Sequence, residues 1–282
     1  MTTMEKIIRE GNDPLVLDEN EMQFFSETIF KLTGIHLTPA KSDLLKTRLR
    51  KRLQDRGFSS YREYKVLLEN IPQSDPEWQS FINILTTNKT DFFREPKHFE
   101  YLIEKFIPEW LKSNEETLRV WSAASSTGEE AYTLAMVLSK YLPKDRSFTI
   151  LGTDVDTNVL KKAQNAVYSM MKFNEIPPEY QSMIDIGKDE AEGWFRIKNE
   201  IKNRVSFRQH NLIEGNYPAE NPFDVVLCRN VLIYFARETV AKVNRKLYAA
   251  TKADGVCMIG HSESFHNITH QWKSHEASIY RK

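Results

Sequence analysis

Short apolar segments alternate with helical segments from residue 117 onward, and this alternation constrains the fold more than any other feature of the chain. The apolar segments have the length and composition of buried strands: LRVWSAA, FTILGTD, VSFRQHNL, FDVVLCRN and GVCMIGH. Helical patterns begin at Glu129, run from Asp156 to Ala166, and run from Glu238 to Ala250. Such alternation predicts an α/β domain with a mostly parallel sheet and helices on both faces.

Residues 18 to about 112 have a helical pattern throughout. The predicted helices begin at Asp18, Thr38-Pro39, Ser60 and Asp75-Pro76. Asp18 and Glu21 have the spacing of a capping box, and Gly34 and Gly57 are expected to end the first two helices. Apolar residues recur three or four positions apart in the first, third and fourth helices, so we predict a small helical bundle.

The stretch between Tyr168 and Val205 fits neither pattern. It contains IPPEY, GKDEAEG and the alternating segment WFRIKNEI. Alternation of apolar and polar residues is typical of a strand with one buried face. We therefore predict an insertion that contains a small antiparallel element.

Charge and hydropathy exclude several classes of protein. Lys and Arg number 39, as do Asp and Glu, so no net charge steers the chain toward nucleic acid or an anionic membrane. The segment MTTMEKIIREGNDP is charged where a signal peptide needs an apolar run, and no later run approaches the ~20 apolar residues of a membrane span. We predict a cytoplasmic protein without membrane insertion, in which Cys228 and Cys257 are reduced and buried.

The loop after the first predicted strand argues against a phosphate-bearing ligand. Residues 123–130 read AASSTGEE and include a single glycine. A dinucleotide site needs several glycines and a helix amino terminus that accepts a pyrophosphate, whereas Glu129 and Glu130 would repel one. S-adenosylmethionine fits these carboxylates, because it carries an ammonium group, a sulfonium and no phosphate. The alternative is that both glutamates only complement the helix dipole.

Polar residues follow the next strands, at the edge where open parallel sheets bind ligands. Asp154 lies 24 residues after Glu130, close to the spacing of a carboxylate that accepts hydrogen bonds from a ribose. It could instead cap the following helix, although Asp156 is better placed to do so. Residues 211–212, an asparagine and a leucine, could bind the adenine of S-adenosylmethionine. Residues 229–234 could hold its amino acid portion and border its methyl group.

Several long motifs resemble the CheR family, the chemotaxis receptor glutamate methyltransferases. The resemblance runs from about residue 20 to the end and is carried by LTTNKTDFFREP, RVWSAASSTGEEAYTLAM, GTDVDTNVLKKA, FDVVLCRNVLIYF and GHSESF. It implies a Rossmann-like domain that binds S-adenosylmethionine over residues 113–282, with a β subdomain at about 168–204. It also implies a helical receptor-recognition domain over residues 1–85, and a linker over 86–112 that closes on the cofactor.

The resemblance further implies a set of site residues. The residues expected to bind the cofactor are Asn88, Thr90, Arg94, Glu130, Asp154, Asn211, Leu212, Asn230 and Val231. The residues Thr86 to Thr90 could otherwise be a solvated linker with helix-capping groups. In some members of the family the β subdomain grips a peptide at the receptor's carboxyl terminus. The β loop there is richer in glycine than IDIGKDEAEG, so we do not predict this tether here.

The implied reaction needs no general base, because a glutamate side chain with a pKa of about 4.3 is already ionised near neutral pH. Positioning of the reactants and exclusion of water should dominate catalysis. We assign orientation of the receptor glutamate to Arg94 and Tyr234. The histidines are expected to lack metal-ligating neighbours, and those predicted to lie in surface loops are His261, His266, His270 and His275. We predict no metal, and S-adenosylhomocysteine as the product.

The second predicted helix carries a local excess of positive charge. Seven cations (Lys41, Lys46, Arg48, Arg50, Lys51, Arg52 and Arg56) against two anions (Asp43 and Asp55) leave an excess of five. Given the resemblance, we predict that Arg48, Arg50 and Arg52 bind the glutamate-rich cytoplasmic domain of a methyl-accepting chemotaxis receptor. The alternative is an ordinary solvated helix face.

Three other functions compete with this interpretation. The first is a methyltransferase that acts on nucleic acid or on a small molecule. One acting on nucleic acid would have an Asn/Asp-Pro-Pro-aromatic turn after the fourth strand, where this chain has Arg229-Asn230-Val231. A non-catalytic binding module would not need the charged cofactor set. A nicotinamide-dependent oxidoreductase is disfavoured by the missing glycines and by Glu129 and Glu130.

Overall fold

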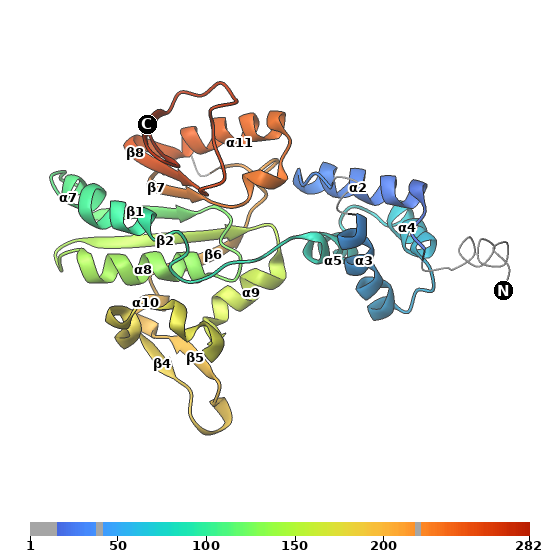
Figure 1. The fold of residues 1–282 in the computed structure, drawn as a ribbon, viewed down its shortest axis with the longest axis horizontal. Helices are drawn as coiled ribbons and strands as arrows, with labels where there is room; N and C mark the ends of the chain where they lie inside the picture. The colour runs from blue at the N-terminus through green and yellow to red at the C-terminus, as the bar shows by residue number, and fades with distance from the viewer. Residues whose placement is uncertain (1–15, 38–41, 218–220) are drawn as a thin grey trace. The chain divides into compact units, whose positions relative to one another are not determined.

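The computed structural model describes residues 16–37, 42–217 and 221–282. The chain divides into two compact units, Met1–Thr87 and Asn88–Lys282. Figure 1 shows the helices of the first unit in blue and the α/β second unit in green to red. Among the described residues, no helix has both the length and the apolar character needed to cross a membrane.

The first unit is the predicted helical bundle. Its helices are α2 (Glu19–Thr33), α3 (Ser42–Arg56), α4 (Tyr61–Asn70) and α5 (Pro76–Leu85). The capping box of Asp18 and Glu21 is present, and Gly34 ends α2 in the left-handed conformation. The predicted start of the second helix at Thr38-Pro39 lies outside the described residues. Phe25, Tyr64 and Phe81 are fully enclosed, so the apolar stripes of these helices face one common core.

A seven-stranded sheet forms the centre of the second unit, with strand order β6-β2-β1-β7-β8-β10-β9. Its strands are β1 (Thr117–Ser122), β2 (Ser147–Asp154), β6 (Val205–Gln209), β7 (Phe223–Cys228), β8 (Thr251–Ile259), β9 (Lys273–Glu276) and β10 (Ile279–Arg281). The predicted strands pair in parallel, whereas β10 runs antiparallel to β8 and β9. The chain order reverses between β1 and β7, which is where open α/β sheets bind ligands.

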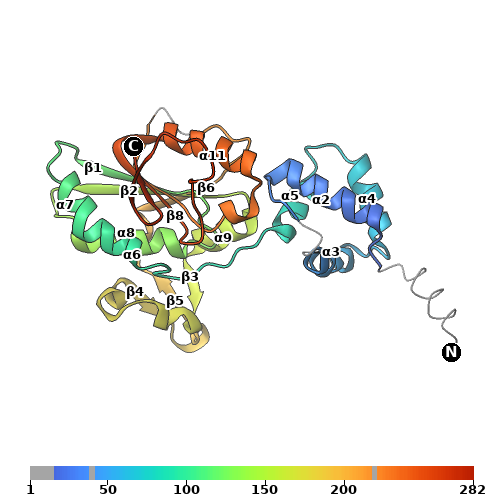
Figure 2. The same ribbon diagram turned by 45° about the horizontal axis from the view of Figure 1, so that its top comes forward.

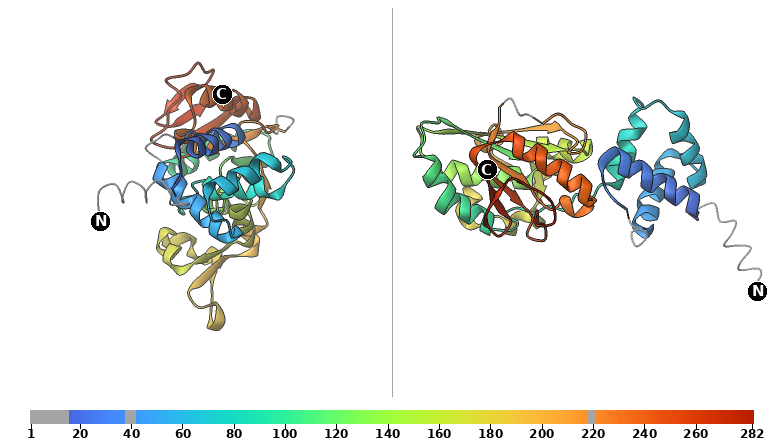
Figure 3. Two further views of the ribbon diagram at one scale, coloured as in Figure 1. Left: turned by 90° about the vertical axis from the view of Figure 1, so that its right-hand side faces the viewer. Right: turned by 90° about the horizontal axis from the view of Figure 1, so that it is seen from above.

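Helices cover both faces of this sheet. They are α8 (Glu129–Tyr141), α9 (Thr157–Asn165) and α11 (Arg237–Ala250). Val225 and Leu227 of β7 belong to the core that includes α8, and Val226 and Cys228 belong to the core that includes α11. Figure 3 (right panel) looks down on α11 from above. Both faces of β7 are therefore buried, which explains its uninterrupted apolar sequence.

Within the second unit, the stretch from Asn88 to Trp110 packs against the sheet. After the irregular residues 88–96 come α6 (Lys97–Tyr101), the π-helix η2 (Leu102–Phe106) and α7 (Ile107–Trp110). Leu102, Phe106 and Ile107 lie in the same core as the sheet. The irregular residues are thus fixed to the α/β unit by the helical turns that follow them.

The predicted insertion is a separate three-stranded antiparallel sheet with the order β3-β5-β4 (Figure 2). Its elements are β3 (Val167–Ser169), η3 (Met170–Glu175), η4 (Pro178–Met183), β4 (Ile184–Ile186), η5 (Asp189–Ala191) and β5 (Trp194–Ile197), and α10 (Asn199–Lys202) follows. We call residues 167–197 the β subdomain. Phe195 and Tyr168 are buried against each other inside it, with ring centroids 5.7 Å apart. The predicted fold class is confirmed.

One prediction needs correction here, and one hairpin was not predicted. His275 was expected in a surface loop but lies in strand β9, exposed and with its ring centroid 5.5 Å from that of Tyr101. The hairpin of β9 and β10 was not predicted, because KSHE and IYR are short and lack an extended apolar alternation. Cys228 and Cys257 are free and buried, as predicted.

Candidate functional site

The single glycine in the loop after β1 has a packing role. Gly128 has φ 95°, and a Cβ atom at this position would lie 2.9 Å from the Ala163 Cβ and 3.1 Å from the Phe207 ring. A side chain would therefore be strained and would push α8 away from α9 and β6. The glycine allows close packing at the start of α8.

The two glutamates at the start of α8 have different surroundings. The buried Glu129 carboxylate accepts a hydrogen bond from Thr127 Oγ1 (2.6 Å) and lies 3.1 Å from Lys172 Nζ. The Glu130 carboxylate accepts one from Ser122 Oγ (2.6 Å), and its other oxygen lies 3.3 Å from Arg229 Nη1. Burial raises the pKa of Glu130, and the charge of Arg229 opposes that shift. Glu130 thus lies at the carboxyl ends of β1 and β7, where a ligand is expected.

Asp154, at the end of β2, lies next to the loop that follows β1. One carboxylate oxygen accepts from the Ser126 N–H (2.9 Å) and the other from the Asp156 N–H (3.0 Å). Burial raises the pKa of Asp154 to about 6, although these hydrogen bonds lower it. The Asp156 side chain caps α9, as predicted. Asp156 therefore does the capping, while Asp154 binds the backbone of the loop after β1 and of the turn after β2.

The irregular segment 88–96 reaches this same edge of the sheet. Asn88 Nδ2 donates to Asp156 Oδ2 (2.7 Å), and Ser126 Oγ donates to the Asn88 carbonyl (2.8 Å). Further along, Phe93 and Glu95 have φ of 52° and 58°, so Arg94 lies between two residues in the left-handed region. Non-glycine residues seldom adopt this conformation, and such strain is often found at functional sites.

Arg229 is the centre of a buried ionic network. Its side chain is 2% exposed and lies 3.2 Å from Glu95 Oε2 and 3.3 Å from Glu130 Oε2. Arg229 Nη2 also donates to the Arg94 carbonyl. The sequence predicted a ligand contact for residues 229–234 without assigning it to Arg229, and the structure directs the Arg229 side chain to the two carboxylates. Arg229 therefore links the Arg94 backbone to Glu130.

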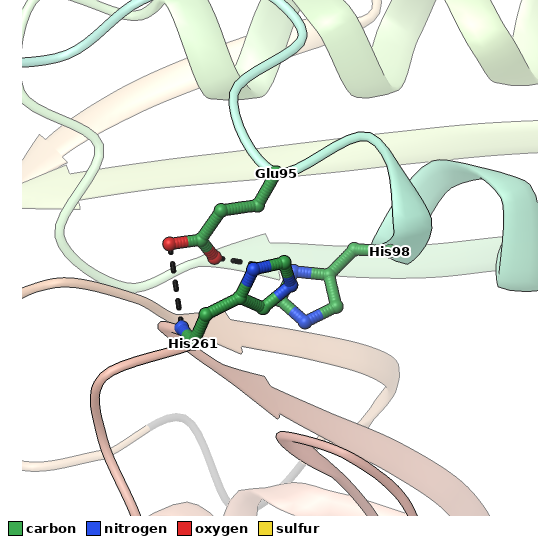
Figure 4. Close-up of side chains that lie close together, drawn as sticks. All are labelled: Glu95, His98 and His261. Atoms are coloured by element: carbon green, nitrogen blue, oxygen red, sulfur yellow. Dashed lines mark hydrogen bonds and ion pairs between the residues drawn. The ribbon is translucent and has the colours of Figure 1, made fainter.

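Glu95 completes this network, and Figure 4 shows its carboxylate beside His98 and His261. Its Oε1 accepts from Asn230 Nδ2 (3.1 Å) and the His261 N–H (3.3 Å), while Oε2 accepts from Arg229 Nε (3.3 Å). Burial alone would raise the pKa of Glu95, but Arg229 and these hydrogen bonds lower it overall. Both oxygens of Glu95 are therefore occupied by donors.

Glu95, His98 and His261 form a cluster whose potential metal-ligating atoms lie within 4.8 Å of one another, within the part of the chain that the structure describes. The expectation that the histidines lack such neighbours is therefore wrong for these two. Burial, together with Arg229, lowers the pKa of His98 to about 3, so its imidazole is neutral at pH 7. Because Arg229 already neutralises Glu95 and would repel a cation, we interpret the cluster as a contact of Glu95 and the start of α6 with the loop that carries His261.

The buried carboxylate of Glu263 binds the turn after β7. Glu263 is 8% exposed and accepts hydrogen bonds from four backbone N–H groups. The donors are Asn230 (2.9 Å), Leu232 (2.7 Å), Ile233 (3.3 Å) and Gly260 (2.5 Å). Asn230 has φ 58°, and this turn continues into the 3-10 helix η6 (Leu232–Tyr234). Glu263 therefore fixes the backbone of the turn that carries Asn230, Val231 and Tyr234.

The structure brings together most of the predicted cofactor residues. Asn88 and Asp154 are linked through Ser126 and Asp156, whereas Arg94, Glu130 and Asn230 are linked through Arg229 and Glu95. The residues 211–212 follow His210, whose N–H donates to the Asp154 carbonyl (2.9 Å). Leu212 is buried, and the half-buried Asn211 accepts from the Ile213 N–H (3.0 Å).

The arginines of α3 lie in the first unit, where three of them make internal contacts, including Arg56, whose Nε lies 3.5 Å from Glu77 Oε2. Arg52 forms a bidentate ion pair with the buried Glu77 (2.7 and 2.5 Å), and Arg48 donates to the carbonyls of Leu85 and Thr86. Arg50 is exposed. The predicted Lys41 lies outside the described residues. Arg48 and Arg52 thus stabilise the bundle, which their charges alone did not reveal.

The sequence alone did not assign these roles to Glu95, Arg229, Glu263 or Lys172. Glu95, Arg229 and Glu263 lie within the motifs FFREP, LCRN and GHSESF. The sequence signal that could have identified them is a charged residue inside an apolar or glycine-containing motif. Most of their partners could not be inferred, because contacts such as Glu95–Arg229, Lys172–Glu129 and Glu263–Leu232 join segments that are far apart in the sequence.

Comparison with known proteins gives matches across both units. Residues 88–281 match the family model described as CheR methyltransferase, SAM binding domain, and residues 20–86 match CheR methyltransferase, all-alpha domain. The chain is 35% identical over 276 residues to the chemotaxis protein methyltransferase of Salmonella typhimurium, covering 97% of this chain and 94% of that protein. It is 34% identical to that of Escherichia coli with the same coverage. Chemotaxis protein methyltransferase 2 of Pseudomonas aeruginosa is 34% identical, with 96% and 95% covered.

Proposed function

This chain belongs to the CheR family of S-adenosylmethionine-dependent methyltransferases, and from that premise we propose that it methylates glutamate side chains of chemotaxis receptors. The product on the receptor would be a glutamate methyl ester. The observation that carries the proposal is the similarity to chemotaxis protein methyltransferases over nearly the whole chain. The receptor would be engaged through its cytoplasmic domain.

The residues at the strand ends fit a cationic nucleoside. Glu130 and Asp154 place two carboxylates at the edge where β1 and β2 end, and the nearby glycine serves helix packing. Asp154 would accept hydrogen bonds from ribose hydroxyls, and Glu130 would face the ammonium group. The remaining cofactor contacts are proposed for Asn88, Thr90, Arg94, Asn211, Leu212, Asn230 and Val231.

The proposed chemistry is an in-line displacement. S-adenosylmethionine supplies a methyl group on a positively charged sulfur, and an ionised glutamate can attack it without a general base. Charge is neutralised in this step, so catalysis depends on alignment and exclusion of water, which can contribute ~7–11 kcal/mol. We assign alignment of the glutamate to Arg94, held by Arg229 and flanked by two left-handed residues, and to Tyr234, on the turn fixed by Glu263.

The nature of the product tests this proposal. Incubation with methyl-labelled S-adenosylmethionine and receptor-containing membranes should label the receptor, and alkali should release the label, because a carboxyl methyl ester is hydrolysed by base. Label that resists alkali, or that appears on RNA in a parallel incubation, would contradict the proposed substrate.

The raised pKa of Asp154 predicts a pH dependence of cofactor binding. Ionised Asp154 accepts hydrogen bonds from the ribose, whereas the protonated acid loses part of that capacity. Because the pKa is about 6, affinity for S-adenosylhomocysteine should fall as the pH drops through that value. Calorimetry across this range should show the fall in the wild type and a weak, pH-independent affinity in Asp154→Asn. A pH profile shared by both proteins would contradict the assignment.

We propose that residues 1–85 recognise the receptor, residues 86–112 close on the cofactor, and residues 113–282 bind it. On the receptor-recognition domain, α3 presents exposed cations, including Lys46, Arg50 and Lys51. A glutamate-rich receptor helix would be attracted to this surface. Arg48 and Arg52 are also proposed to bind the receptor, but their contacts inside the bundle make Arg50 the clearer test of this role.

Charge reversal on α3 should weaken receptor methylation. The variant with Arg50→Glu and Lys51→Glu is expected to raise the KM for the receptor about tenfold at low salt, and by less at high salt because ions screen exposed charges. Affinity for S-adenosylhomocysteine should not change. Arg62→Glu, an exposed charge reversal on α4, is the matched control. Equal effects of the two variants would contradict a specific role for α3.

A further inference from the structure

The β subdomain holds the segment that leads to Arg94. Lys172 Nζ, on η3, donates to the Thr90 carbonyl (2.7 Å). Glu175, one turn further on, accepts from the Phe92 N–H (2.9 Å). Two side chains of the insertion therefore bind the backbone of the cofactor-closing segment on either side of Asp91.

The charges around Lys172 show that its position is specific. Its ammonium group lies 3.1 Å from Glu129, 3.5 Å from Asp91 and 3.6 Å from Glu175. The Glu129 side chain is 2% exposed and belongs to the first turn of α8, next to Glu130. A buried carboxylate needs a counter-charge, so removal of the Lys172 ammonium would disturb the start of α8. It would also remove the hydrogen bond to the Thr90 carbonyl.

Aromatic packing joins the same parts. The Phe92 ring lies edge-on to that of Tyr168, with centroids 4.9 Å apart, and the Phe93 ring lies 4.7 Å from that of Tyr180. Tyr168 also donates from its hydroxyl to the Thr127 carbonyl in the loop before α8 (2.8 Å). The β subdomain thus contacts two of the loops proposed to bind the cofactor.

We propose that Lys172 and Glu175 are positioning residues for methyl transfer, through which the β subdomain sets the conformation of the segment Thr90–Arg94. This inference rests on the proposed roles of Thr90 and Arg94. The segment contains the left-handed Phe93, a conformation that needs support from its surroundings. Asn88 anchors one end and Arg229 the other, while Lys172, Glu175 and Thr133 bind the backbone between them.

Lys172→Met tests this inference, because it removes the charge and keeps the length of the side chain. We expect its Kd and KM for S-adenosylmethionine to rise about tenfold to a hundredfold, the range for loss of a hydrogen bond to a charged group. Lys172→Arg should restore most of the affinity. Lys188→Met, on the exposed hairpin of the β subdomain, should behave as the wild type.

Hydrogen exchange separates positioning from general destabilisation. In Lys172→Met the amides of Phe92 and Phe93 should exchange faster, while those of the central strands β1 and β7 should keep wild-type rates. If Lys172→Met fails to fold, Glu175→Ala, whose side chain is 28% exposed, provides the same test at the Phe92 amide. Unchanged exchange of these amides together with wild-type affinity would overturn the inference.

Asn88→Ala distinguishes this inference from the proposed site. Weak cofactor binding in both Asn88→Ala and Lys172→Met is the expected result. If only Asn88→Ala binds weakly, the site assignment stands and the positioning role of the β subdomain is wrong. If both bind as the wild type does, the assignment of the segment to the cofactor site is itself wrong.

Discussion

Arg229→Met should abolish methyl transfer and lower the free energy of unfolding by about 3–5 kcal/mol, the usual cost of removing one partner from a buried ionic network. The substitution leaves Glu95 and Glu130, each with 13% of its side chain exposed, without their guanidinium partner. It also removes the donor to the Arg94 carbonyl, so the Arg94 side chain should lose its fixed position.

The stability deficit of Arg229→Met should depend on pH. Without Arg229, burial would raise the pKa of Glu95 and Glu130 above the values of the unfolded chain. Their ionisation then opposes folding at high pH, and protonation relieves this as the pH falls through the raised pKa values. Denaturant unfolding should therefore show a larger deficit at about pH 8 than at about pH 5.

Arg281→Met is the matched control, because Arg281 forms a bidentate pair with Glu109, whose side chain is 51% exposed. A pair with one exposed partner contributes little, so this variant should lose less than about 1 kcal/mol and retain activity. Equal stability of the two variants would show that burial of the Arg229 network has no energetic consequence.

Glu263→Gln is expected to have the second largest effect. The carboxylate accepts four backbone N–H groups, whereas a carboxamide has one oxygen and directs N–H groups at the other donors. Each buried N–H left without an acceptor costs about 1–3 kcal/mol. The turn from Asn230 to Tyr234 should become mobile, so methyl transfer should fall about a hundredfold or more, with weaker cofactor binding.

Thermal unfolding, calorimetry with S-adenosylhomocysteine and methyl-transfer assays would measure these effects. Glu276→Gln is the control, since Glu276 forms an exposed pair with Lys105. A Glu263→Gln protein with wild-type activity would show that this turn does not need the carboxylate. A protein that is destabilised but retains wild-type affinity and turnover would limit Glu263 to a structural role.

The sequence predicted well those helices and strands that are marked by neighbouring residues, such as helix caps and apolar runs. The caps at Asp18, Ser60 and Asp75 depend on neighbouring residues only, and the structure has all three. The central strands are buried on both faces, so their apolar runs identified them. Strands β9 and β10 were missed, because their sequences are short and because the pairing of β10 with β8, and of β9 with β10, is determined by tertiary contacts.

For the candidate site, the sequence predicted which residues lie at the strand ends better than it predicted which groups their side chains contact. Asp154, Asn211 and Asn230 follow parallel strands, and the topology of such a sheet brings strand ends together. The partners of a charged side chain depend on the packing of distant segments. Arg52 could be assigned to a basic face, but its pairing with Glu77 requires the relative placement of α3 and α5. Glu263 likewise binds a turn about thirty residues earlier in the chain.

The contacts of Glu95 and Glu263 also have a consequence for biosynthesis. Glu95 accepts a hydrogen bond from the His261 N–H, and Glu263 closes the turn after β7, so both contacts require residues that follow β8 in the chain. A nascent chain that ends before Gly260 lacks these contacts, however well its earlier strands have paired. Binding of S-adenosylmethionine by a nascent chain would therefore have to wait until residues 260–263 have been synthesised and have reached the turn after β7.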